Sequence, residues 1–396
     1  MKKLIAISVM FALITGAAFA QTAVSGAFES RFTLIDTVFD DSDVTNATIG
    51  GTLHTGYVQL SGQNSEGTFG ALIRLRAENM TDAASNRWHR AFAWWRPIPQ
   101  LRIFLGMDPD GLFENAALAG WSFHQGNEEF IGFQNWDFWR GIFPGNWDGF
   151  GLAFTITPMP GFNINLVVPT SGYGDHLQGW PRHRQDQVIN RVNYDDLLAS
   201  LRLNANFTID GIGRVLFNYT GPRQDFGEIP DNEHFGDIGL SFLLTAVDGL
   251  QVQVGFSTFI PNDSDQSDFP LRLGLAAHYA ASDWGLKTRF GTNITDAQTL
   301  VHGSVMPWYN FGNFRVNFDI GITLIAPDEG DSLFGFWLSP YLTVPAGAGT
   351  FQIGILLYNV AEGRTIADGN AGWRATQAVA EPDMKFAIPM RFVYSF

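Results

Sequence analysis

Basic side chains at alternate positions of apolar stretches are the residues of this sequence best suited to chemistry. Between Phe69 and Glu78, for example, Arg74 and Arg76 alternate with apolar residues. Successive side chains of a β-strand point to opposite faces, so basic groups spaced in this way gather on one face of a sheet. A guanidinium group presents a planar fork that binds carboxylates, so such a face could hold and select solutes. We take nine residues as candidates: Arg74, Arg76, Arg102, Arg202, Arg214, Arg272, Lys287, Arg289 and Arg315.

The pattern alone does not show that these groups have a function, because arginines also occur on a sheet face that is simply in contact with water. Arg31, Lys385 and Arg391 share the same spacing. Both interpretations, a selective basic wall and a merely solvated one, stay open at this point.

Acidic residues are concentrated instead in the polar stretches between the apolar ones. The longest such stretch runs from Asp108 to Asp148 and is also rich in tryptophan. It is either a solvated surface loop or a segment that faces the basic residues across a narrow gap, where opposed charges would order water and polar solutes. The six candidate residues for such a constriction are Asp108, Asp110, Glu114, Glu128, Glu129 and Asp137.

Catalytic and metal-binding patterns are poor. The eight histidines show no metal-ligand spacing, and no G-x-S-x-G sequence occurs. Asp108-Pro109-Asp110-Gly111 lacks the remaining ligands of a calcium loop. We therefore expect no enzyme activity, no metal site and no cofactor.

Composition excludes several classes of protein. The chain has 396 residues, of which 45% are hydrophobic, with 35 Phe and no Cys. These values argue against a disordered chain and a disulfide-stabilised scaffold. The net charge of −15 argues against a nucleic-acid partner, which would require a basic surface. Two lysines, the apolar run Leu4–Ile14 and Ala18-Phe19-Ala20 predict a signal peptide over residues 1–20, followed by a single domain over 21–396.

The elements that must position the basic residues are amphipathic strands of about ten residues. No stretch of the mature chain reaches the ~20 apolar residues of a membrane-spanning helix. Period-2 alternation predicts about 18 strands, within a range of 16–18 for a closed antiparallel barrel. They run near 22–35, 51–62, 68–79, 87–96, 100–107, 149–157, 161–169, 197–209, 212–220, 236–246, 249–259, 270–280, 284–293, 299–309, 314–324, 334–344, 350–359 and 384–396.

Connections between these strands are alternately short and long. Asp210-Gly211 and Val247-Asp248-Gly249 are typical of the short ones. The apolar face of many strands is uninterrupted while the polar face carries Arg, Lys or Asn, which favours a lipid-facing exterior and a polar interior. We also expect aromatic residues near strand ends to lie at the membrane interface: Trp94, Trp95, Trp308, Trp337, Tyr341 and Tyr394.

In these features the chain resembles Gram-negative outer-membrane porins, although no subfamily can be assigned. The terminal strand, with Phe392, Tyr394 and Phe396 at alternate positions, is similar to the signal that the barrel-assembly machinery reads in that family. The resemblance implies short periplasmic turns, long extracellular loops and a long third loop folded into the lumen. It also implies an outer-membrane location among lipopolysaccharide-like lipids, a possible homotrimer, and passage of small polar solutes or ions.

Three functions fit this architecture. The first is a porin for passive diffusion of small hydrophilic solutes. The second is a substrate-selective channel, for carboxylates along the basic wall or for sugars along an aromatic track. The third is a structural or adhesive surface barrel whose loops do the work.

Overall fold

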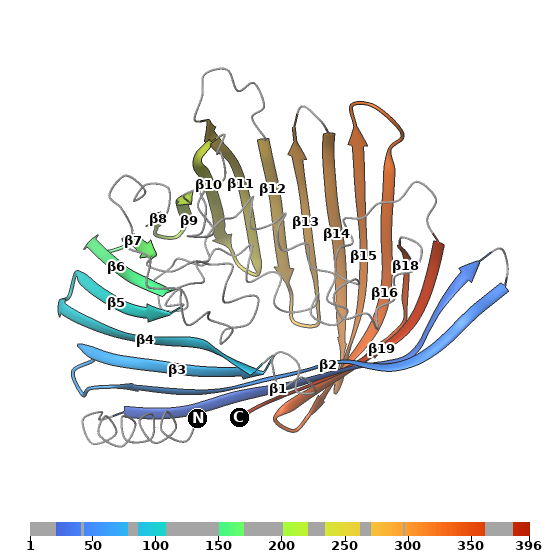
Figure 1. Cartoon of the computed structure of the whole chain (residues 1–396), viewed down its shortest axis with the longest axis horizontal. Coiled ribbons are helices and arrows are strands. Elements are labelled where there is room, and N and C mark those ends of the chain that lie inside the picture. Colours follow the sequence, from blue (N-terminus) through green and yellow to red (C-terminus); the bar gives the residue numbers. More distant parts are fainter. Residues whose placement is uncertain are drawn as a thin grey trace, which may run out of the picture.

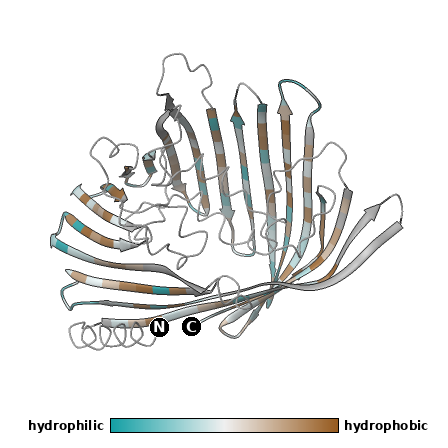
Figure 2. Cartoon of the chain, in the orientation of Figure 1, coloured by the Kyte–Doolittle hydropathy of each residue, from teal (hydrophilic) through white to brown (hydrophobic). Residues whose placement is uncertain are grey.

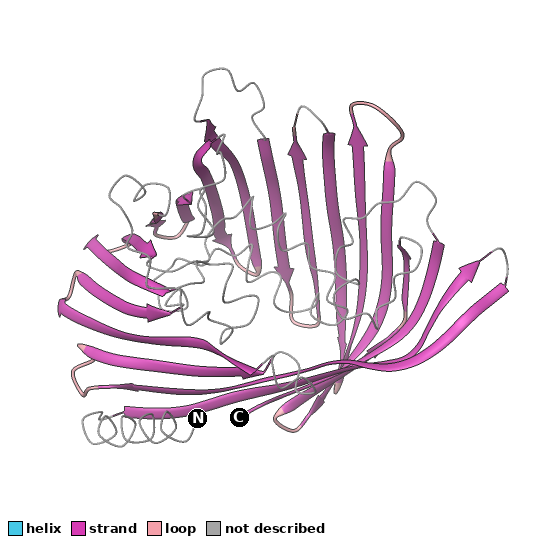
Figure 3. Cartoon of the chain, in the orientation of Figure 1, coloured by secondary structure: helices cyan, strands magenta, loops and turns pink. Residues whose placement is uncertain are grey.

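The computed structural model describes residues 21–40, 43–77, 86–107, 150–169, 201–220, 234–261, 271–295, 298–360 and 383–396. Every regular element in these ranges is a strand (Figure 3). Within the described ranges there is no helix long and apolar enough to cross a membrane. The strands are β1 Gln21–Asp40, β2 Asp43–Gln63, β3 Phe69–Ala77, β4 Asn86–Ile98, β5 Leu101–Met107, β6 Phe150–Met159, β7 Phe162–Pro169, β8 Arg202–Ile209, β9 Gly213–Thr220, β10 His234–Val247, β11 Leu250–Pro261, β12 Leu271–Ala280, β13 Trp284–Ile294, β14 Gln298–Phe311, β15 Phe314–Pro327, β16 Leu333–Ala346, β17 Gly349–Gly354, β18 Leu356–Val360 and β19 Asp383–Ser395.

The strands form one closed antiparallel sheet. Each pairs with its neighbours in sequence, and β1 closes the barrel by pairing with β2 on one side and with β19 on the other (Figure 1). β17 and β18 are two parts of one barrel strand interrupted at Ile355, because both pair with β16 on one side and β19 on the other. Counted in this way the 19 segments make 18 strands, which confirms the predicted barrel and strand number.

Polar side chains face the inside of this barrel and apolar side chains face outward. In β15, Phe318 and Ile320 are 38% and 41% exposed, whereas the alternating Asn317 and Asp319 are 1% and 2% exposed. Figure 2 shows the resulting bands of alternating hydropathy along the strands. A soluble barrel has the opposite polarity, so this arrangement is the one expected for a barrel surrounded by lipid. It confirms the alternation predicted from the sequence.

Short turns join the hairpins at one end of the barrel. The β10–β11 turn has two residues, Asp248 and Gly249, and the β8–β9 turn has three, Asp210–Ile212. Gly211 and Gly249 have positive φ (73° and 74°), which a residue with a Cβ rarely adopts. Two connections at the opposite end, 295–297 and 328–332, are also short, unlike the long loops predicted for that side.

The hairpin of β1 and β2 is longer than the sequence indicated. We expected a loop over 36–50, but the strands continue until Asp40 pairs with Asp43 (Figure 1). Asp40 and Asp43 are therefore strand residues and not loop residues. The alternation is weak here because Thr and Asn, which tolerate both environments, replace the large apolar residues.

Candidate functional site

The inner face of the barrel carries the basic residues. Every Arg or Lys whose side chain the structure describes lies on a strand position that alternates with exposed apolar residues: Arg74, Arg96, Arg102, Arg214, Arg272, Lys287, Arg289, Arg315 and Arg391. Seven of the nine sequence candidates are in this set. For Arg76 and Arg202 the structure describes the backbone only, opposite Tyr57 and Thr220. Arg96 was missed because the following Pro97 ends the alternation there.

Two of these arginines are held by the same three-residue arrangement. Arg74 donates from Nε and Nη2 to Gln59 Oε1 at 2.9 and 2.6 Å, and its Cζ lies 4.3 Å from the centre of the Tyr57 ring. Six strands further round the barrel, on β15, Arg315 donates from Nε to Asn310 Oδ1 at 2.9 Å. Its Cζ lies 4.2 Å from the centre of the Trp308 ring. An amide and a ring two residues apart on one strand thus fix an arginine on the next, which lowers the entropy lost when the arginine binds a ligand.

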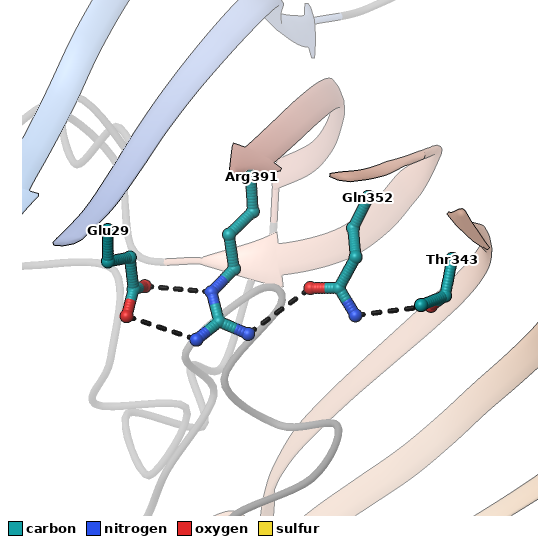
Figure 4. A network of polar contacts seen from close by, with 4 residues as sticks. All are labelled: Glu29, Thr343, Gln352 and Arg391. Carbon is teal, nitrogen blue, oxygen red and sulfur yellow. Dashed lines mark hydrogen bonds and ion pairs between the residues drawn. The ribbon is translucent and has the colours of Figure 1, made fainter. Parts of the chain in front are cut away.

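Interior acids are fewer, and Glu29 is neutralised. Its carboxylate accepts two hydrogen bonds from Arg391, from Nε at 2.8 Å and from Nη2 at 3.0 Å, and the two side chains are 19% and 6% exposed. Arg391 Nη1 donates to Gln352, and Gln352 donates to Thr343 (Figure 4). This polar chain joins β1 to β19, β17 and β16, and so crosses the line where the barrel closes. Asp319 is the other acid with a described side chain on the inner face.

A neutral amide ladder lines the inner face of β6–β9. Thr155 donates to Asn165, Asn165 to Asn204, and Asn204 to Asn218, at 2.7, 3.1 and 2.7 Å. The four residues are opposite one another from strand to strand and are buried. Because these amides satisfy one another, this sector supplies rigidity more than it supplies binding groups.

Part of the inner face is apolar, on β3–β7. It consists of the buried residues Leu72, Phe92, Trp94, Phe104, Ala153 and Val167. Arg102 lies above it, with its Cζ 5.2 Å from the centre of the Trp94 ring. The six predicted constriction acids, Asp108, Asp110, Glu114, Glu128, Glu129 and Asp137, lie outside the described residues.

For four of the six aromatic residues expected at the membrane interface, the prediction was wrong. Trp94, Trp308, Trp337 and Tyr341 face inward and are buried, while Trp95 (53% exposed) and Tyr394 face outward as expected. Three of them rest on a glycine opposite: Trp94 on Gly70, Trp308 on Gly285 and Trp337 on Gly321. The alternation of faces along the strand could have predicted the inward direction of these rings, since each glycine opposite them lies on the inner face.

Exposed aromatic residues do gather outside, beside the short turns. Tyr309, Phe311 and Phe314 flank one turn with ring centres 4.5 and 5.5 Å apart, and Trp284 lies 5.1 Å from Tyr279 beside another. Such rings suit the headgroup level of a bilayer.

The C-terminal residue completes the closure of the barrel. Phe396 exchanges both backbone hydrogen bonds with Gly26, at 2.9 and 3.0 Å. Its ring occupies the space that a side chain at residue 26 would need, although 60% of Phe396 is exposed. Phe392 and Tyr394 on β19 and Phe396, directly after its end, lie at alternate positions on the outward side.

Deleting Phe396 is expected to reduce the amount of folded barrel in the membrane severalfold, because the β1–β19 pairing loses its last two hydrogen bonds and its outer ring contact. Gly26→Val should have a similar effect by displacing the ring, whereas Gly347→Asn, in a turn with open space, should not. The heat-modifiable band in gels measures all three. Unchanged insertion after the deletion would contradict a role for Phe396 in assembly.

The fold is that of outer-membrane porins and channels. Salmonella typhi OmpF in complex with daunomycin matches at 12% identity over 96% of this chain and 99% of its own, with a TM-score of 0.51. Pseudomonas aeruginosa OccK1 (OpdK) matches at 8% identity over 96% and 99%, with a TM-score of 0.56. Acinetobacter baumannii OccAB4 matches at 6% identity over 96% and 99%, with a TM-score of 0.51. No protein-family model and no curated protein matches the sequence.

Proposed function

We propose that this protein is an outer-membrane porin that forms a water-filled channel for passive diffusion of small hydrophilic solutes and ions. The observation that carries this is the division of side chains between the two faces of the closed sheet. Described Arg and Lys side chains line the inside, and the large apolar side chains that are exposed lie on the outside of the described strands. A barrel of 16–18 strands is wide enough to leave an aqueous channel. The protein acts as a channel and not as an enzyme.

The basic interior favours anions. Among described side chains the inner face has nine basic groups against two acids, and one of these acids is paired with Arg391. We assign the wall of the channel to the nine sequence candidates, with Arg96 added. The segment 108–148 is proposed to narrow the lumen, with its acids towards Arg74, Arg76 and Arg102. The apolar inner patch on β3–β7 supports this, since an aromatic-rich segment would cover it.

Residues 1–20 are proposed to be a signal peptide, and 21–396 a single barrel domain inserted by the barrel-assembly machinery with Phe392, Tyr394 and Phe396 as its signal. Lipopolysaccharide-like lipids would surround the barrel. The barrel would be one of three in a homotrimer.

Single-channel recording in planar bilayers tests the function. A large and weakly selective conductance supports the porin. A small conductance blocked by one solute would support a substrate-selective channel, which the two held arginines favour. The absence of any conductance would contradict both and support a structural or adhesive barrel.

The orientation of the barrel in the membrane can be tested by labelling single introduced cysteines, because the chain has no native cysteine. Ser282 lies exposed in the β12–β13 turn, and Ser332 lies exposed in the β15–β16 connection at the other end. A membrane-impermeant thiol reagent on intact cells is expected to label Ser332→Cys and to spare Ser282→Cys. Labelling of Ser282→Cys alone would invert the proposed topology.

A further inference from the structure

Arg315 is held so that its outer edge remains for a ligand. Asn310 engages Nε, and the Trp308 ring supports the guanidinium from one face. No described residue accepts a hydrogen bond from Nη1 or Nη2, and the side chain is half-buried. With Nε engaged, the end-on edge formed by Nη1 and Nη2 is the one that can bind two acceptor atoms together.

A second donor lies directly opposite. Thr343 on β16 is the register partner of Arg315. Its hydroxyl oxygen accepts from Asn317 Nδ2 at 3.0 Å and from Gln352 Nε2 at 3.2 Å, which uses both lone pairs. The hydroxyl proton is left to donate, and no described residue accepts it. Arg315 and Thr343 therefore offer hydrogen-bond donors from adjacent strands.

The surrounding charges are positive. His278 on β12 is the register partner of Lys287 on β13, and β13 is separated from β15, which carries Arg315, by one strand. Asp319 lies four residues further along β15, roughly 13 Å away along the strand. Glu29 is neutralised by Arg391, and Asp283 lies exposed in a turn. A ligand here gains most from negative charge.

We propose that Arg315 and Thr343 form a subsite near the short-turn end of the barrel that binds the carboxylate of a small organic anion. The carboxylate meets Nη1 and Nη2 end-on with its two coplanar oxygens, and the Thr343 hydroxyl donates to one of them. The subsite rests on the proposed channel function, because solutes must enter the interior to reach it. It differs from Arg74, where Gln59 already accepts from Nε and Nη2.

The probe is potassium benzoate, with potassium phosphate for comparison, in a chloride background. Benzoate binding is measured twice, as current block in single channels and as saturation-transfer NMR on the detergent-solubilised barrel. Arg315→Lys keeps the charge but loses the fork, so both readouts should show binding at least about tenfold weaker. Arg315→Gln is the second variant. The matched control is Arg31→Lys on β1, an arginine outside the residues assigned to the wall, for which benzoate binding should be unchanged.

Benzoate binding that is unchanged in both Arg315 variants would overturn the subsite. Phosphate that binds as tightly as benzoate and equally depends on Arg315 would overturn the carboxylate assignment. A wild-type barrel that binds benzoate through Arg315 in the NMR experiment but conducts no current would contradict the channel function and still support the subsite.

Discussion

Replacing Arg391 by methionine is expected to destabilise the barrel by about 3 kcal/mol, the largest single-residue effect that the structure indicates. The substitution leaves the Glu29 carboxylate without its two charge-assisted hydrogen bonds, at a site where 19% of that side chain is exposed. It also removes the donor to Gln352 and so breaks the polar chain across the closure between β1 and β19. Urea unfolding of the barrel in lipid vesicles measures the change.

The matched control removes both charges together. Because an unpaired charge is the main cost, the double variant Glu29→Gln, Arg391→Met should recover most of the stability lost in the single variant. A double variant as unstable as the single one would mean that Arg391 acts through packing alone, and a single variant within about 0.5 kcal/mol of wild type would contradict the account of the closure.

Replacing Arg74 and Arg76 together by serine is expected to shift ion selectivity towards cations and to raise conductance. In the β3–β4 register Arg74 is opposite Arg90, and Arg76 is opposite Arg87, so four arginine positions share one face. Each removed charge lowers the attraction for a passing anion by about 1 kcal/mol at contact in water, less once salt screens it. The shift is measured as the bi-ionic reversal potential of the double variant, and the comparison protein is Arg214→Ser, which removes an arginine from β9.

Serine at both positions with unchanged selectivity and conductance would show that β3 does not border the narrowest part of the channel. A selectivity shift without a rise in conductance would mean that the two arginines act through their charge and do not limit the width of the channel. In that case the proposed narrowing by segment 108–148 would be wrong, while the basic wall would stand.

Hydrophobic alternation was sufficient to predict the barrel, the strand number and most strand positions. β15 illustrates why, because each of Phe318, Ile320 and Ile322 alternates with a polar residue or glycine. Parity was lost where apolar residues run together, as in Met306-Pro307-Trp308-Tyr309, and there the inward Trp308 was assigned to the outside. Sequence periodicity tells faces apart only when the two faces differ in polarity.

The contacts between strands could not be predicted in the same way. Glu29 meets Arg391 because the barrel closes in one register, and that register depends on all the intervening strands together. The held arginines depend on hairpin register too, since Asn310 must be opposite Arg315 for its Oδ1 to reach Nε. Such pairings become readable only once the turn residues fix which positions face each other.

The most direct test of the central claim is the reversal potential of the purified wild-type protein in a planar bilayer under a tenfold potassium chloride gradient. An aqueous channel lined by the described basic residues predicts a stable conductance with a reversal potential of the sign for chloride preference, decreasing as the salt concentration rises and screens the wall. A conductance with clear cation preference, or a folded and inserted barrel with no conductance, would contradict it.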